Sequence, residues 1–215
     1  MSSGPSSTTV IVPLRTGGKT RLSSRLRESE RTALAGAMLA DVAASLAAAG
    51  VGRILVAAEG PAALAAADAI GLESVRDAPG AGGLDRALAH AARHVPADAP
   101  LLVVAADLPC LRAGEIEQVL ADPAPVVIAP TSDGGTGGLL RRPAGVMPTG
   151  YGAASAERHL RFAAEAGVAA STVRAPGFEH DVDTVADLLA LRELPVGAAT
   201  ATLLTTLERT GRAAS

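Results

Sequence analysis

The stretch LLVVAADLPCL, residues Leu101 to Leu111, decides the fold. Its first six residues are apolar around a pair of β-branched valines, which predicts a strand buried on both faces, as in the centre of a parallel sheet. Pro109 cannot continue the hydrogen-bond ladder, so Asp107 is expected at the carboxyl end of the strand, where open α/β sheets bind ligands. Asp107 either faces a cleft and a cation or caps a helix or turn.

Composition is that of a single globular domain. The chain has 215 residues, 48% of them hydrophobic and 19% charged, enough for one α/β domain with a sizeable core. We expect this domain to span 8–209, between a disordered tail at 1–7 and a polar tail at 210–215.

The net charge of −3 gives no electrostatic signature for nucleic acid. No leader and no apolar run near the length of a membrane span is apparent, so no membrane partner is expected. The single cysteine, Cys110, excludes an internal disulfide and a cysteine-based zinc site, and fits a reducing cytoplasm.

Strand and helix patterns alternate along most of the chain, which predicts a mostly parallel sheet with helices on both faces. Strands are expected at 8–14, 53–58, 72–76, 101–106, 124–130 and 170–174. Helices are expected at 30–49, 61–70, 84–94, 113–120, 153–166, 185–192 and 198–209. The glycine-rich segment 131–138 is expected to be a loop, and His159 to lie on the surface of its helix.

The first strand runs into a basic, glycine-bearing segment, RTGGKTRL at 15–22. Gly17 and Gly18 allow the backbone to approach a ligand closely and supply amide donors. Lys19 and Arg21 add positive charge, so a phosphate site between strand and helix is one interpretation. The spacing is not that of a P-loop, and a flexible loop with solvated cations is the alternative.

A second acidic segment, HDVDT, lies at 180–184. In an extended segment, residues two apart point the same way, so Asp181 and Asp183 are expected to direct two carboxylates at one point. Their mutual repulsion would be relieved by a divalent cation, and oxygen ligands of this kind suit Mg²⁺. The alternative is local: Asp183 caps the helix that follows Thr184, and Asp181 pairs with an arginine.

The basic glycine-bearing segment, Asp107, the glycine-rich segment 131–138 and the HDVDT segment together supply the groups that nucleotidyl transfer requires. In that reaction metal ions and cations neutralise a triphosphate, and backbone amides hold an acceptor. Five motifs then make a resemblance specific: VPLRTGGKTRL (12–22), DLPCL (107–111), DGGTGGL (133–139), YGAASAERH (151–159) and DVDTVADL (181–188). With these motifs the chain resembles the phosphoenolpyruvate/2-phospho-L-lactate guanylyltransferase family of coenzyme F420 biosynthesis, over about 8–194.

The resemblance implies a fold of the glycosyltransferase-A, molybdopterin-guanylyltransferase type. It also implies the reaction: GMP passes from GTP to phosphoenolpyruvate or 2-phospho-L-lactate, giving the guanosine diphosphodiester and pyrophosphate. Phosphoenolpyruvate is the expected acceptor, because the alanine-rich composition resembles that of actinobacterial members, which use it. Asp107, Asp181 and Asp183 match the family's magnesium-binding aspartates, which makes Mg²⁺ the implied cofactor. Lys19 matches the lysine of the basic loop and completes the expected catalytic set.

The resemblance extends to the substrate contacts. Gly152 and Ser155 match acceptor-binding positions, and Gly137 falls where the family usually has threonine or asparagine. A backbone contact at Gly137 would survive, whereas a side-chain contact would be lost. The other expected substrate-binding residues are Arg15, Arg21 and Thr136. The expected nucleotide-binding residues are Pro13, Gly17, Gly18, Gly82, Gly83 and Asp85, with 77–84 as the candidate base pocket. Asp85 stands where relatives are expected to have asparagine, and Arg15 where they commonly have lysine.

Two alternatives remain beside this interpretation. A molybdopterin guanylyl- or cytidylyltransferase shares the fold, although the glycine-rich amino-terminal signature of those enzymes, L-A-G-G-x-S-x-R-M-G-x-D-K, is not seen. A catalytically silent nucleotide-binding module is the other alternative, and the presence of all three aspartates argues against it.

Overall fold

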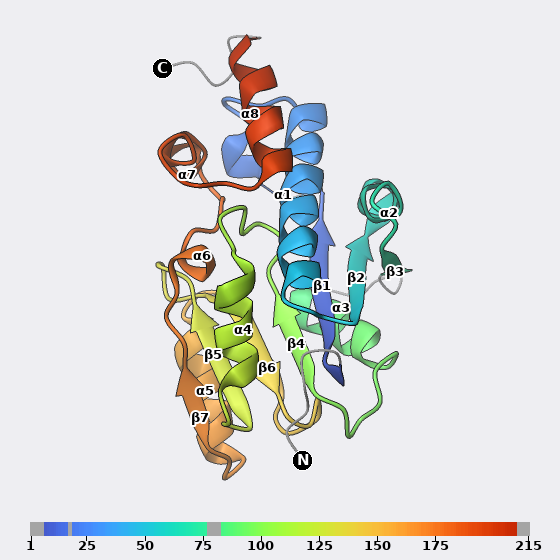
Figure 1. Cartoon of the computed structure of the whole chain (residues 1–215), viewed down its shortest axis with the longest axis vertical. Coiled ribbons are helices and arrows are strands. Elements are labelled where there is room, and N and C mark those ends of the chain that lie inside the picture. Colours follow the sequence, from blue (N-terminus) through green and yellow to red (C-terminus); the bar gives the residue numbers. More distant parts are fainter. Residues whose placement is uncertain (1–6, 17–18, 77–82, 210–215) are drawn as a thin grey trace.

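The computed structural model describes residues 7–16, 19–76 and 83–209, and within them one seven-stranded sheet has the order β3-β2-β1-β4-β6-β5-β7 (Figure 1). Its strands are β1 (Thr9–Arg15), β2 (Arg53–Glu59), β3 (Glu73–Arg76), β4 (Leu101–Val104), β5 (Val126–Pro130), β6 (Thr136–Arg141) and β7 (Ala170–Thr172). Only β6 runs antiparallel to its neighbours, β4 and β5. The predicted α/β fold with a mostly parallel sheet is confirmed.

Helices cover both faces of this sheet (Figure 1). They are α1 (Glu28–Ala48), α2 (Gly60–Asp68), α3 (Leu84–Ala92), α4 (Ala113–Ala121), α5 (Ser155–Glu165), α6 (Pro176–Glu179), α7 (Val185–Ala190) and α8 (Ala198–Arg209), with a short 3₁₀ helix at Thr20–Leu22. The main core packs α1, α2, α4 and α6 on one face, while α3 and α5 close the other. α7 and α8 pack against α1 in a separate cluster.

The longest helix, α1, begins with a capping contact in which the Glu30 carboxylate accepts the backbone N–H of Arg27 at 2.7 Å. Its 21 residues are long and apolar enough, by length and composition only, to cross a membrane. The expectation that no apolar run has this length is therefore wrong for α1. Leu34, Met38 and Leu46 are fully buried in the structure. Packing in the core accounts for the apolar character of α1.

β6 replaces part of a predicted loop, because residues 136–138 are strand and not connection. Gly137 and Gly138 obscure the strand pattern in the sequence. The packing requires glycine at these positions because it leaves no room for a side chain. A Cβ on Gly138 would lie 2.8 Å from Cε1 of Phe178 and 3.2 Å from Cβ of Ala129. Glycine in a strand often marks such a close approach, and here it admits the buried ring of Phe178 from α6.

The site lies at the carboxyl edge of the sheet because β1 and β4 are parallel neighbours. Their following segments therefore leave the sheet at the same edge. β4 ends at Val104, two residues earlier than expected, and Asp107 follows in a turn. The backbone N–H of Val182 donates to the carbonyl of Asp107 at 3.3 Å, which brings the segment before α7 to this edge as well.

Candidate active site

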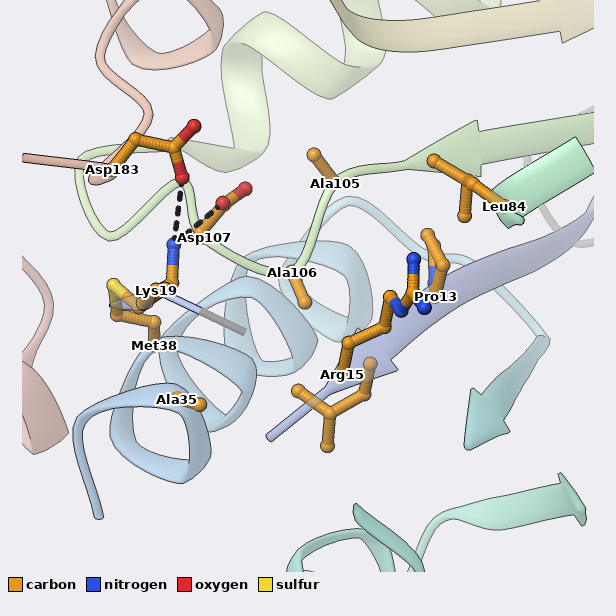
Figure 2. A pocket seen from close by; sticks show the side chains of 11 residues that line it. Pro13, Arg15, Lys19, Ala35, Met38, Leu84, Ala105, Ala106, Asp107 and Asp183 are labelled. Atoms are coloured by element: carbon orange, nitrogen blue, oxygen red, sulfur yellow. Dashed lines mark hydrogen bonds and ion pairs between the residues drawn. The ribbon is translucent and has the colours of Figure 1, made fainter. Parts of the chain in front are cut away.

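Three segments distant in sequence meet at Lys19 (Figure 2). The Nζ atom of Lys19 donates to Oδ2 of Asp107 at 2.8 Å and to Oδ1 of Asp183 at 3.3 Å. It also donates to the carbonyl of Val182. A single ammonium group thus joins the segments after β1, after β4 and before α7.

Lys19 is the only lysine in the chain, and its surroundings keep it charged. Burial lowers the pKa of its ammonium group, but the charges and hydrogen bonds of Asp107, and then of Asp183, outweigh burial and hold that pKa above its usual value. Its backbone is left-handed, with φ 57°, an uncommon conformation outside glycine. That conformation directs the side chain of a loop residue back to the sheet edge.

The caps of the helices nearby exclude a helix-capping role for Asp183 at α7 and for Asp107 at α4. Thr184 caps α7: its hydroxyl accepts the N–H of Asp187 at 3.3 Å, and the Asp187 carboxylate accepts the N–H of Thr184 at 2.7 Å. Asp183 is therefore not the cap. Arg112 occupies the cap position of α4, so Asp107 does not cap that helix either.

Asp181 and Asp183 line the same cavity of about 250 Å³, together with Asp133 and Arg21. Burial, and after it the negative charges of Asp107, Asp133 and Asp183, together raise the pKa of Asp181 to about 6. The two carboxylates of the HDVDT segment thus border one strongly negative space.

The donor set at this edge fits Mg²⁺ when substrate phosphates complete it. Among the described residues, no group of three or more His, Cys, Asp or Glu side chains is arranged to hold a metal alone. Asp107 and Asp183 nevertheless converge on one cation, the ammonium group of Lys19. Mg²⁺ is usually bound by one or two carboxylates with phosphate oxygens and waters, and this pair supplies that number of carboxylates.

A second cavity of about 210 Å³ lies on the other side of Asp183, which lines both. Its lining residues are Pro13, Leu14, Arg15, Lys19, Ala35, Met38, Leu84, Ala105, Ala106, Asp107 and Asp183 (Figure 2). Of the predicted nucleotide contacts, Pro13 reaches this cavity and Gly83 precedes its residue Leu84. Gly17, Gly18 and Gly82 lie outside the described residues.

Two predicted contacts have partners elsewhere. The Asp85 carboxylate accepts the backbone N–H of Tyr151 at 3.1 Å and does not line the cavity with Pro13 and Lys19. Arg15 lines the cavity but its guanidinium group is paired with Glu59, at 3.0 Å between Nη2 and Oε1.

The predicted acceptor residues gather around β6 and the start of α5. Thr136 and Ser155 are buried, and their hydroxyl oxygens are 2.9 Å apart. Gly152 is exposed in the preceding turn, with φ 113°. A Cβ on Gly137 would lie 2.8 Å from the carbonyl oxygen of Phe178. Position 137 therefore offers only its backbone.

His159 is not on the helix surface as predicted; it is fully buried. Its Nδ1 lies 3.1 Å from Oγ1 of Thr136, and its Nε2 accepts the backbone N–H of Gly150 at 3.0 Å. Burial lowers the pKa of His159 to about 4. The sequence did contain a signal for this burial. Ser155, His159 and Ala163 recur every fourth residue and form the buried stripe of α5.

Two residues near the site, Asp133 and Phe178, were not predicted from the sequence. The Asp133 carboxylate accepts the hydroxyl of Thr131 and the N–H of Gly135, which lower its pKa, and it borders the cavity of Asp181. The Asp-Gly-Gly sequence is a recognisable signal for this turn. No sequence signal indicated that Phe178 packs against Gly137 and Gly138.

Comparisons with known proteins agree with this architecture. The family described as "Guanylyl transferase CofC like" matches residues 8–206. A phosphoenolpyruvate guanylyltransferase of Roseiflexus castenholzii is 37% identical over 187 residues, covering 86% of this chain and 88% of that protein. A 3-phospho-D-glycerate guanylyltransferase of Phenylobacterium zucineum is 34% identical over 207 residues, covering 92% and 94%. The structure of a nucleotidyl transferase from Methanothermobacter thermautotroptrophicus superposes with a TM-score of 0.64 at 20% identity, covering 86% of this chain and 96% of that one. The chain belongs to the CofC-like guanylyl transferase family.

Proposed function

We propose that this enzyme transfers GMP from GTP to a small phosphorylated carboxylic acid, phosphoenolpyruvate in the first place, and releases pyrophosphate. The observation that carries the proposal is the convergence of Lys19, Asp107 and Asp183 between two cavities at the carboxyl edge of the sheet, in a chain of this family. The named relatives support the guanylyl group and the class of acceptor.

The proposed step is a direct displacement. A phosphate oxygen of the acceptor attacks the α-phosphorus of GTP and forms the new P–O bond. The bond between the α-phosphorus and the bridging oxygen to the β-phosphorus breaks, and pyrophosphate leaves with that electron pair. The attacking oxygen is already anionic at neutral pH, so the step requires no general base.

The cations of the site act on the leaving group. The Lys19 ammonium lies beside the cavity of Pro13 and Leu84 and holds Asp107 and Asp183 in the structure. When substrate binds, it can turn from Asp107 toward the departing phosphates. Arg21 lines the adjacent cavity and adds a second positive charge. Preorganised charges of this kind, aimed at charge that develops in the transition state, are usually the largest single contribution to catalysis.

We further propose Mg²⁺ as the metal, held by Asp107 and Asp183, with Asp181 beside them. When bound, Mg²⁺ supplies neutralisation of triphosphate charge. The contribution of the chain is to hold the carboxylates of Asp107 and Asp183 at one point. Removal of divalent metal by a chelator should therefore abolish transfer and leave the protein folded.

The acceptor is proposed to bind where β6 meets the 150–155 segment. Gly152 is exposed there and Gly137 has no side chain, and glycine backbone close to a ligand suits an anion that carries both phosphate and carboxylate. 2-Phospho-L-lactate and 3-phospho-D-glycerate share this chemistry and are the competing acceptors. The resemblance of the motifs supports coenzyme F420 biosynthesis as the pathway, and the cytoplasm remains the predicted location.

The test is pyrophosphate release across GTP, ATP and CTP, each with phosphoenolpyruvate, 2-phospho-L-lactate and 3-phospho-D-glycerate. We expect release only with GTP and fastest with phosphoenolpyruvate. Equal turnover of ATP and GTP would overturn the guanylyl specificity. No release with any acceptor, from protein that binds GTP, would support the silent nucleotide-binding module instead.

A further inference from the structure

A buried chain of hydrogen bonds links three elements behind the acceptor region. The backbone N–H of Gly150 donates to Nε2 of His159 at 3.0 Å, so Nε2 carries no proton. A neutral imidazole then has its proton on Nδ1, which lies 3.1 Å from Oγ1 of Thr136 and donates to it. The same Thr136 oxygen lies 2.9 Å from Oγ of Ser155, and either hydroxyl can donate in that pair.

The same imidazole lies beneath the turn that precedes α5. Its ring packs edge-to-face against Tyr151, with centroids 5.0 Å apart. Two other side chains form hydrogen bonds to the backbone of this turn. Arg158 donates to the carbonyl of Gly150 at 2.7 Å, and Asp85 accepts the N–H of Tyr151 at 3.1 Å. The backbone of 150–155 is thus fixed from the protein side, and the exposed Gly152 is presented to solvent.

We propose that His159 is a positioning residue for the acceptor, whose neutral imidazole fixes the Ser155 hydroxyl and the 150–155 segment against β6. The inference rests on the proposed function and deepens it, because it assigns acceptor affinity to a residue that the acceptor does not touch. His159 acts through Thr136 and Gly150, and not as an acid or base in the reaction.

A purely packing role accounts poorly for this position. An apolar side chain would fill the same volume without the desolvation cost of a buried imidazole. Both ring nitrogens are instead hydrogen-bonded, one to Thr136 in β6 and the other to Gly150 in the 150–155 segment. The pKa of about 4 keeps the ring neutral over the physiological pH range, so Nδ1 remains the donor and Nε2 the acceptor.

The experiment compares three substitutions of His159 with a matched control. His159→Asn retains a donor near the position of Nδ1, His159→Gln retains an acceptor near Nε2, and His159→Leu retains volume alone. His94→Gln, at an exposed histidine of the same chain, is the control. KM for phosphoenolpyruvate and KM for GTP are measured separately for each protein, with thermal unfolding as the check on folding.

We expect His159→Leu to raise KM for phosphoenolpyruvate by about 10- to 100-fold, the range for buried hydrogen-bonding groups left without partners, with KM for GTP within about twofold. His159→Asn should recover most of the acceptor affinity, and His94→Gln should behave as wild type. Thr136→Val interrupts the same chain, so its effect and that of His159→Leu should be far from additive in the double variant.

The outcomes separate the two claims. If the wild type transfers no GMP, the proposed function fails. If the wild type is active and His159→Leu keeps wild-type KM for phosphoenolpyruvate, or raises both KM values equally, the positioning role is wrong. If His159→Leu does not fold, Thr136→Val decides: a wild-type KM for phosphoenolpyruvate, or equal changes in both KM values, overturns the inference.

Discussion

The ammonium group of Lys19 lies 2.8 Å from the carboxylate of Asp107, a residue 88 positions further along the chain. This ion pair is mostly shielded from water, since the Lys19 side chain is 11% exposed. It borders the space in which we propose that metal and triphosphate bind. Binding of substrate therefore requires Lys19 to turn from Asp107 toward the phosphates, and the pair defines the resting state of the site.

Replacing Lys19 with methionine should reduce the transfer rate by about 100- to 1,000-fold, because the charge that stabilises the leaving pyrophosphate is lost. The measurement is kcat with GTP and phosphoenolpyruvate at saturation. Arg53→Met is the control, since it removes a cation that pairs with Glu73 on the surface. A Lys19→Met enzyme with wild-type kcat would show that Lys19 is only a structural counter-ion.

Changing Asp107, Asp181 or Asp183 to asparagine keeps shape and removes charge. Each change should lower the transfer rate by about 100- to 1,000-fold, and double changes should cost much less than the product of the single ones, because the carboxylates act as a unit. Asp68→Asn, at an exposed position on α2, should have no effect. Near-normal rates for both Asp181→Asn and Asp183→Asn would place the metal elsewhere.

The buried His159 predicts a stability change with pH. Its pKa is about 4 in the folded protein against 6.5 when exposed. The unfolded chain therefore takes up the proton first as pH falls, and the folded protein loses stability from pH 6.5 down to pH 4. Between pH 7 and pH 4.5 the loss from this residue should be about 2 kcal/mol. Urea unfolding of wild type and His159→Asn measures it as a difference, in which shifts common to both proteins, such as that of Asp181, cancel. Equal pH dependence in the two proteins would contradict the assignment.

Gly138 should not tolerate alanine, because the new Cβ would lie 2.8 Å from Cε1 of Phe178. Overpacking of this kind typically costs about 1 to 3 kcal/mol of unfolding free energy. The cost should shrink in a Phe178→Leu background, which removes the clashing ring atom. Gly114→Ala, where a Cβ meets nothing within 4 Å, should leave stability unchanged or slightly higher. An equal cost of Gly138→Ala in both backgrounds would exclude Phe178 as its cause.

Local sequence patterns predicted the strands and the edge at which Asp107 lies, because an apolar run that stops at Asp-Leu-Pro carries its own signal. They did not predict β6, since Gly137 and Gly138 have low strand propensity and the packing partner that favours them, Phe178, is 40 positions further along the chain. Tertiary packing overrode the local preference there.

The contacts that side chains make with distant segments were the second feature that local sequence patterns could not predict. The extended HDVDT segment correctly predicted that Asp181 and Asp183 border one space. Local sequence patterns could not predict that Asp85 accepts a hydrogen bond from the backbone of Tyr151, or that Arg15 pairs with Glu59. Both contacts join residues that are far apart in the sequence. His159 was misplaced because α5 has few large apolar residues to mark its buried face.

The most direct test of the account is the product formed from GTP and phosphoenolpyruvate in the presence of Mg²⁺, followed by ³¹P NMR. The account predicts a new pair of diphosphodiester resonances and pyrophosphate in equal amounts, both absent from the Asp107→Asn reaction over the same time. Release of GDP and phosphate, release of GMP without a diphosphodiester, or an unchanged mixture with folded enzyme would contradict it.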